Sequence, residues 1–128
     1  MAEQGRGRVL IVEDDENTRA AFRTVLELAG WAVDEAAGGE EALRVAGRRP
    51  PEIALVDISI PGLDGWETTR RLKGEPATAN VPVIAVTGHA LDRDRELARE
   101  AGCDGYLVKP IAPRQLLAEI ERLTRPPG

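Results

Sequence analysis

The stretch Ile-Ala-Leu-Val-Asp-Ile-Ser-Ile (53–60) places a carboxylate, Asp57, inside an otherwise apolar run. A short apolar run of this kind is typical of a buried strand. An ionised carboxylate in apolar surroundings costs free energy unless a positive charge compensates it. The run therefore predicts a buried strand with a charged site where the strand ends.

Four other short apolar runs predict further strands, at Val9–Val12, Ala32–Ala36, Val83–Val86 and Tyr106–Val108. The segments between them carry apolar residues at helical spacing. Strand and helix alternate five times, which predicts a single α/β domain, a doubly wound five-stranded parallel sheet with five helices on its two faces. We expect this domain to span residues 8–124, with a flexible head at 1–7 and a tail at 125–128.

Local signals refine three of the predicted helices. Asp64 followed by Glu67 resembles a capping box at the start of the third helix, and Pro113 suits the first turn of the last helix. The segment Asp92–Ala101 is helical by propensity but holds few large apolar residues. We expect that helix to pack only weakly on the core.

The composition excludes several classes of protein. The chain has 128 residues, 42% of them hydrophobic and 30% charged, with a net charge of −5, so it has no general attraction for nucleic acid or anionic membranes. Its one cysteine, Cys103, allows no internal disulfide and no multi-cysteine zinc site. The polar start lacks a signal-peptide core, and no apolar run approaches the ~20 residues of a membrane-spanning helix. We expect one soluble cytoplasmic domain without nucleic-acid or membrane partners.

Polar residues follow four of the predicted strands directly. Because the carboxyl ends of parallel strands share one edge of the sheet, these side chains are expected to meet there: Glu13, Asp14, Asp57, Thr87 and Lys109. An acidic run opening a helix is also often a solvated cap, but Asp57 within its apolar run favours a site. Carboxylates suit Mg²⁺, and a lysine beside them would help to keep Asp57 ionised. An aspartate so placed can attack a phosphoryl group to form an acyl phosphate.

Four motifs resemble the receiver domain of two-component response regulators in order and spacing. They are Val-Leu-Ile-Val-Glu-Asp-Asp (9–15), Ala-Leu-Val-Asp-Ile-Ser-Ile-Pro-Gly-Leu-Asp-Gly (54–65), Val-Ile-Ala-Val-Thr-Gly-His-Ala (83–90) and Gly-Tyr-Leu-Val-Lys-Pro (105–110). The resemblance runs from about Arg8 to Leu123. It implies a flavodoxin-like fold of the receiver type. Pro61 stands one position later than in most receivers, a frequent variation that leaves the site assignment intact.

The resemblance implies a role for each site residue. Asp57 would accept the phosphoryl group, and Glu13 and Asp14 would hold Mg²⁺ together with Asp57 and the backbone carbonyl of Ser59. Thr87 and Lys109 would contact the phosphoryl oxygens. Thr87 and Tyr106 would form the switch, Tyr106 rotating inward after Thr87 moves. The Lys109–Pro110 peptide is expected to be cis.

The resemblance also implies the partners. A sensor histidine kinase or a histidine phosphotransfer protein would donate the phosphoryl group, and a downstream protein would recognise the face formed by Asp92–Ala101, Tyr106 and Pro113–Leu123. A weak homodimer on phosphorylation is left open. The protein would act as a single-domain bacterial regulator without an output domain, dephosphorylating itself but turning over no external substrate.

Other functions stay as alternatives. The protein could be a phosphorelay intermediate or a phosphate sink for a hybrid kinase. A Mg²⁺-dependent phosphohydrolase with an aspartyl nucleophile would carry a second acid where Ser59 stands, and a binding-only pseudo-receiver would lack residues that are present here. Among the remaining side chains, we expect His89 to be a surface residue that tunes dephosphorylation. Trp31, Trp66 and Cys103 are expected to serve packing.

Overall fold

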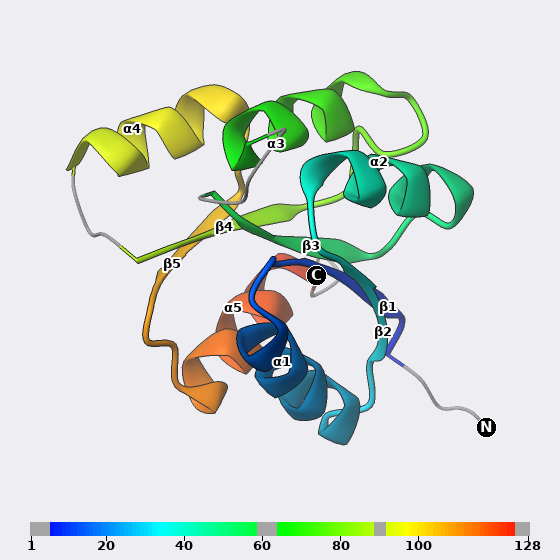
Figure 1. Ribbon diagram of the computed structural model, residues 1–128, viewed down its shortest axis with the longest axis vertical. Helices are drawn as coiled ribbons and strands as arrows, with labels where there is room; N and C mark the ends of the chain where they lie inside the picture. Colours follow the sequence, from blue (N-terminus) through cyan, green and yellow to red (C-terminus); the bar gives the residue numbers. More distant parts are fainter. Residues whose placement is uncertain (1–5, 59–63, 89–91, 125–128) are drawn as a thin grey trace.

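The structure is a computed structural model that describes residues 6–58, 64–88 and 92–124 (Figure 1). Strands and helices alternate along the described chain. The strands are β1 (Arg8–Val12), β2 (Ala32–Ala36), β3 (Ile53–Asp57), β4 (Val83–Thr87) and β5 (Gly105–Val108). The helices are α1 (Glu16–Leu28), α2 (Gly39–Arg48), α3 (Gly65–Gly74), α4 (Asp92–Ala101) and α5 (Pro113–Thr124).

The strands form one parallel sheet in the order β2-β1-β3-β4-β5. Helices α1 and α5 cover one face of the sheet, and α2, α3 and α4 lie on the other (Figure 1). This arrangement confirms the predicted doubly wound α/β fold. It places the carboxyl ends of β1, β3 and β4 side by side, where ligands gather in such sheets.

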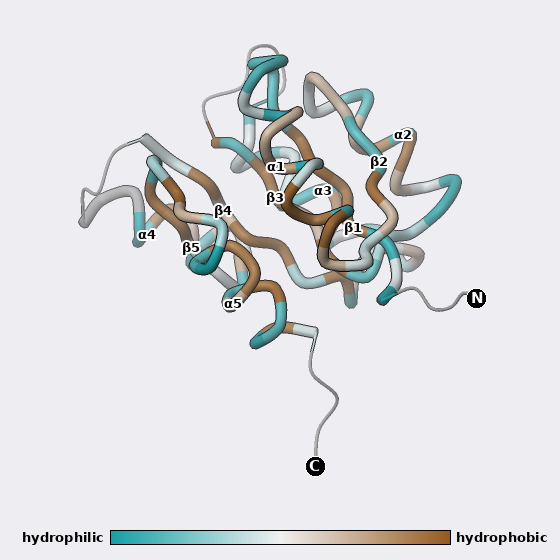
Figure 2. Tube along the Cα trace, turned by 90° about the horizontal axis from the view of Figure 1, so that it is seen from below, coloured by the Kyte–Doolittle hydropathy of each residue, from teal (hydrophilic) through white to brown (hydrophobic). Residues whose placement is uncertain are grey.

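Alternating side chains of the strands build two separate cores, one on each face of the sheet. Val9 and Ile11 of β1 join the cluster under α1 and α5, whereas Leu10 and Val12 join the cluster under α2 and α3. Figure 2 shows the apolar residues concentrated in the strands between these two layers. Burial on both faces explains why the central strands β1, β3 and β4 read as continuous apolar runs, whereas the edge strand β2 has only Ala36 buried.

Two strands end one polar residue later than the runs that predicted them. Asp57 ends β3 opposite Val86, and Thr87 ends β4 opposite Val108. Ladder hydrogen bonds use backbone atoms, so a polar side chain does not stop the strand. Both residues are therefore fixed by the sheet itself.

Several predicted helix features are present. Asp64 caps α3 by accepting a hydrogen bond from the Glu67 N–H at 2.8 Å, while the Glu67 carboxylate pairs with Arg70 and Arg71. Helix α5 begins at Pro113, as expected. Helix α4 has the predicted bounds, and its described part contributes no residue to either core cluster, although Ala98 and Ala101 are buried.

Backbone contacts begin shortly before β1. The Arg6 N–H donates to the Gly30 carbonyl at 3.1 Å, and the Ala32 N–H donates to the Gly7 carbonyl at 2.9 Å. These two residues of the segment predicted as a flexible head thus touch the fold, while residues 1–5 and the tail lie outside the described chain. Within the described residues, no helix has the length and apolar character needed to span a membrane.

Candidate functional site

Three carboxylates meet where β1 and β3 end. Glu13 and Asp14 directly follow β1, and Asp57 is the last residue of β3, the strand paired with β1. One carboxylate oxygen from each of the three residues lies within 4.8 Å of the others. Glu13 and Asp57 are only 2% and 3% exposed, whereas Asp14 is exposed. The structure thus brings together the three acidic side chains that the sequence pointed to, and we call them the acidic corner.

Lys109, just after β5, supplies positive charge to the acidic corner. Its Nζ donates to Asp57 Oδ2 at 2.8 Å and to Glu13 Oε1 at 3.0 Å. Its backbone N–H donates to the Thr87 carbonyl at 2.7 Å, which ties the residue to the end of β4. Burial alone would lower the pKa of Lys109, but the hydrogen bonds to Asp57 and Glu13 outweigh it and the pKa is raised. The ammonium therefore stays charged at neutral pH.

Glu13 forms hydrogen bonds through both its main chain and its carboxylate. Its N–H donates to the Ala36 carbonyl at 3.0 Å, and Glu13 Oε2 accepts from the Asp15 N–H at 3.1 Å. Burial, and to a smaller extent the hydrogen bond with Asp57, raise the pKa of Glu13 to about 7, although the hydrogen bond from Lys109 acts in the opposite direction. This carboxyl group therefore titrates near neutral pH when no cation is bound.

The two predicted switch residues lie on neighbouring strands. Thr87, at the end of β4, is 1% exposed and stands beside the strand that carries Asp57. Tyr106 in β5 is partly buried, and the Arg95 guanidinium of α4 lies over its ring, 4.7 Å from the centroid. The Lys109–Pro110 peptide is cis, as predicted. Ser59 and His89 lie outside the described residues.

The donor set of the acidic corner fits Mg²⁺. All three side chains offer hard carboxylate oxygens, the ligands that this ion prefers. Lys109 pairs with two of these three carboxylates, and Asp14 adds a further carboxylate beside them, so the corner is suited to attract a cation. The exposed Asp14 leaves the corner accessible from solvent.

The sequence profile of the response regulator receiver domain matches residues 9–121 of the chain. This chain belongs to the response regulator receiver family. The fold is the one expected of a receiver domain. Response regulators are signalling proteins that interact with histidine kinases and downstream targets, so the predicted functional class is confirmed.

Individual relatives support the same family. The chain is 37% identical over 113 residues to the polar-differentiation response regulator DivK of Brucella ovis, an alignment covering 88% of this chain and 92% of that protein. It resembles the chemotaxis protein CheY4 of Vibrio cholerae with a TM-score of 0.87 and 28% identity, covering 91% of this chain and 97% of that one. The chain also resembles the receiver domain of sensor histidine kinase PA1611 from Pseudomonas aeruginosa, with a TM-score of 0.86 and 33% identity, covering 92% of this chain and 97% of that one. The structure of the PA1611 receiver domain holds a magnesium ion coordinated in the active-site cleft.

Sequence reasoning missed the part that Gly65 plays in this receiver domain. Gly65 is the first residue of α3 and lies against the backbone of Asp57 and Ile58 at the end of β3. A Cβ at this position would lie 2.4 Å from Ile58 Cα and 2.7 Å from the Asp57 carbonyl oxygen, and both of these are backbone atoms. Glycine at this position lets α3 start directly against the segment that carries Asp57. The Asp-Gly pair after the third strand was the available signal.

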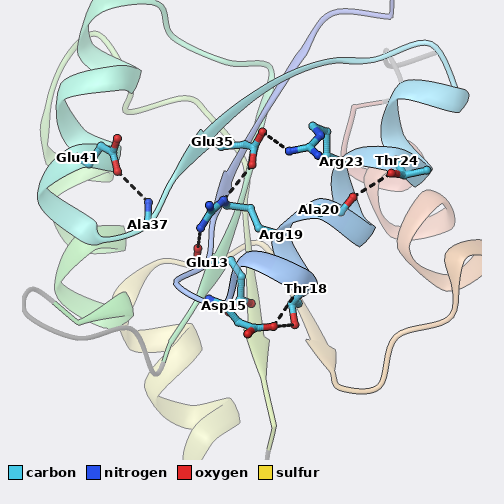
Figure 3. Close-up of polar contacts among 10 residues, drawn as sticks. All are labelled: Glu13, Asp15, Thr18, Arg19, Ala20, Arg23, Thr24, Glu35, Ala37 and Glu41. Carbon is cyan, nitrogen blue, oxygen red and sulfur yellow. Dashed lines mark hydrogen bonds and ion pairs between the residues drawn. The ribbon is translucent and has the colours of Figure 1, made fainter.

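Sequence reasoning also gave no role to Arg19. This residue of α1 reaches back to the end of β1 and donates from Nη1 to the Glu13 carbonyl at 2.9 Å (Figure 3). Its spacing from Glu13 gave no signal, because an arginine on an exposed helix turn is common and the contact depends on how α1 packs.

Three other singled-out residues serve packing in this receiver domain to different degrees. Trp31 is 6% exposed and belongs to the core under α1 and α5, while Trp66 is partly buried. Cys103 packs at the edge of the core under α2 and α3, and burial raises its pKa to about 11. A thiol with that pKa is a weak nucleophile, which agrees with a packing role.

Proposed function

We propose that Asp57 is the phosphoryl acceptor of this receiver domain and that Glu13, Asp14, Thr87 and Lys109 form the machinery around it. The observation that carries the proposal is the Lys109 ammonium, which bonds to two nearly fully buried carboxylates at once. An ion pair buried in this way is costly to build and is weak evidence for stability alone. Its place at the carboxyl end of the central strands favours a chemical role.

In the proposed reaction, an oxygen of the Asp57 carboxylate attacks the phosphorus of a phosphohistidine. An O–P bond forms, the N–P bond breaks, and the imidazole leaves with the bonding electron pair and takes up a proton from solvent. Lys109 keeps Asp57 ionised beforehand, since its Nζ lies 2.8 Å from Asp57 Oδ2. The same ammonium then stabilises charge on the transferring oxygens.

The acidic corner would also hold Mg²⁺, through Glu13, Asp14, Asp57 and, in this proposal, the backbone carbonyl of Ser59. When bound, the ion would offset the repulsion between the incoming phosphoryl group and the carboxylates. The three carboxylates supply the oxygen donors for this role. Glu13 must lose its proton to take part, because its pKa lies at about 7.

Phosphorylation would act as a local electrostatic switch. An aspartyl phosphate adds up to about two negative charges and three acceptor oxygens. The hydroxyl of Thr87 and the ammonium of Lys109 would bind these oxygens, and Tyr106 would follow the movement of Thr87. Helix α4 would respond readily, since its described part contributes nothing to either core cluster.

The remaining parts of the proposal concern partners and location. A histidine kinase or a histidine phosphotransfer protein would donate the phosphoryl group. A downstream protein would recognise the face formed by α4, Tyr106 and α5, and a weak homodimer on phosphorylation is part of the same proposal. The acyl phosphate would be hydrolysed at its own site, with His89 tuning the rate, and the protein would work in the cytoplasm.

The test is incubation with Mg²⁺ and acetyl phosphate, followed by intact mass measurement. The wild type should gain one phosphoryl group and Asp57→Ala should gain none. Asp34→Ala serves as the matched control, because Asp34 of β2 pairs with Arg8, the first residue of β1, away from the acidic corner. No gain in the wild type, or an equal gain in Asp57→Ala, would overturn the proposal.

A further inference from the structure

The Arg19 guanidinium joins the acidic corner to the edge of the sheet (Figure 3). Its Nη1 donates to the Glu13 backbone carbonyl at 2.9 Å, and its Nε donates to Glu35 Oε1 on β2 at 2.9 Å. The arginine side chain is only 19% exposed. A planar guanidinium with two fixed donors sets the direction of both contacts, which a flexible ammonium would not do.

Glu35 is itself fixed, so it can serve as the outer support of Arg19. Its second oxygen, Oε2, accepts from Arg23 Nη1 at 2.7 Å. The burial of Glu35 would raise its pKa, but the hydrogen bonds from Arg23 and Arg19 outweigh burial and hold the pKa below its ordinary value. The carboxylate therefore stays ionised at neutral pH and keeps both arginines.

The contact of Arg19 with Glu13 complements the other bonds of that residue. The Glu13 N–H is bonded to Ala36, and its carboxylate is bonded to the Asp15 N–H and Lys109. Glu13 lies just past the end of β1, where the main chain turns from the sheet toward α1. The bond from Arg19 fixes the Glu13 carbonyl and hence the plane of the peptide that joins Glu13 to Asp14.

We propose that Arg19, supported by Glu35, is a positioning residue that orients Glu13 and Asp14 for cation binding and phosphoryl transfer. Arg19 touches no reacting atom and acts through the peptide between the two acidic residues. The effect of Arg19 on cation binding rests on the proposed function, whereas the effect of Arg19 on the Glu13 main chain does not. Loss of an outer partner of this kind typically weakens metal binding by about tenfold or more.

Arg23 provides a matched control. It is an arginine of the same helix and bonds to the same Glu35 carboxylate, but its described contacts do not reach Glu13. Arg19→Met and Arg23→Met each remove one arginine from Glu35. Only the first also removes the bond to the acidic corner.

The first measurement is hydrogen exchange of the Glu13 and Asp15 amides in the metal-free, unphosphorylated protein. Arg19→Met should speed exchange of both amides by about fivefold or more, because the loop loses one of its anchors. Arg23→Met should change them less than about twofold. Arg19→Lys keeps the charge but not the planar guanidinium with its two fixed donors, so its exchange rates should lie between those of the wild type and Arg19→Met.

The second measurement is Mg²⁺ affinity by isothermal titration calorimetry. We expect a loss of about tenfold in Arg19→Met, with Arg23→Met near the wild type. If the wild type itself bound no Mg²⁺, the proposed function would fail, while amide exchange would still decide the role of Arg19. Equal amide exchange and equal Mg²⁺ affinity in the Arg19 and Arg23 variants would overturn the inference. If Arg19→Met does not fold, Arg19→Lys is compared with Arg23→Met in its place.

Discussion

Lys109 Nζ lies 2.8 Å from Asp57 Oδ2 and so joins the end of β5 to the end of β3. The same nitrogen lies 3.0 Å from Glu13 Oε1, beyond β1. One ammonium thus connects side chains from three strand ends across the intervening β4. Each carboxylate in this contact is almost fully buried, so the charge balance of the acidic corner depends on Lys109.

Replacing Lys109 with methionine should lower the phosphorylation rate strongly and the stability moderately. Phosphorylation by acetyl phosphate should slow by about 100-fold, since a cation aimed at the developing charge is lost. The free energy of unfolding in urea should fall by about 2 kcal/mol, because two buried carboxylates lose their partner. Mg²⁺ binding should persist, because the oxygen ligands remain. A phosphorylation rate equal to the wild type would show that Lys109 has no part in the reaction.

The raised pKa of Glu13 predicts that Mg²⁺ affinity depends on pH. Burial raises this pKa to about 7, so protons compete with the cation below that pH. Calorimetric titrations from pH 8 to pH 6 should show the Mg²⁺ affinity decreasing below pH 7, with a slope that approaches about tenfold per pH unit. Glu13→Gln, which cannot titrate, should bind more weakly at pH 8 and show a flatter profile. The same pH dependence in both proteins would assign the effect to another group.

The same pKa predicts the sign of a stability change in the metal-free protein. The pKa of Glu13 is raised from 4.5 to about 7 on folding, so the folded protein binds the proton more tightly than the unfolded chain. The contribution of Glu13 to the free energy of unfolding is fully present below pH 4.5 and is lost as the pH rises through 7. The free energy of unfolding of the wild type, relative to Glu13→Gln, should fall by about 2 kcal/mol between pH 5 and pH 8. A rise over this range would contradict the assignment.

Gly65→Ala tests the close approach of α3 to Asp57. A new Cβ would meet the backbone of Ile58 at 2.4 Å, so we expect a loss of about 2 kcal/mol despite the better helix propensity of alanine. The matched control is Gly74→Ala in the same helix, where nothing lies within 4 Å of the new Cβ. That variant should be neutral or gain up to ~1 kcal/mol. Equal effects at the two positions in urea denaturation would refute the steric account.

Cys103 should react slowly in the native protein. Burial raises its pKa to about 11, so little thiolate exists at pH 8. Alkylation by iodoacetamide at this pH should be slower by roughly 100-fold than in the unfolded chain. Rapid labelling under native conditions would mean that the thiol is accessible and ionised.

The fold was predictable because burial on both faces leaves a direct mark in the sequence. The strand Ile53–Asp57 reads as an apolar run, and strands so separated along the chain, with helices between them, allow only a parallel sheet. The grouping of Glu13, Asp57, Thr87 and Lys109 followed from that sheet, since parallel strands end at a common edge. Strand ends were less predictable, because Asp57 and Thr87 continue the ladder through their backbone atoms.

The supports of the acidic corner were not predictable from sequence. The bond from Arg19 to the Glu13 carbonyl depends on the packing of α1 beside β2, which no local pattern encodes. The need for glycine at position 65 arises from contact with Ile58, seven positions earlier, rather than from a special backbone angle. Spacing therefore located the reactive groups, whereas three-dimensional packing determines how they are held.

The most direct test of the account is to locate the phosphoryl group. The wild-type protein would be phosphorylated with Mg²⁺ and acetyl phosphate, reduced with borohydride to convert an aspartyl phosphate into homoserine, and mapped by peptide mass spectrometry. Homoserine should appear at position 57 and nowhere else, and no product should form when Mg²⁺ is chelated. Homoserine at position 14 or at another aspartate position, with Asp57 unmodified, would contradict the assignment of Asp57 as the phosphoryl acceptor.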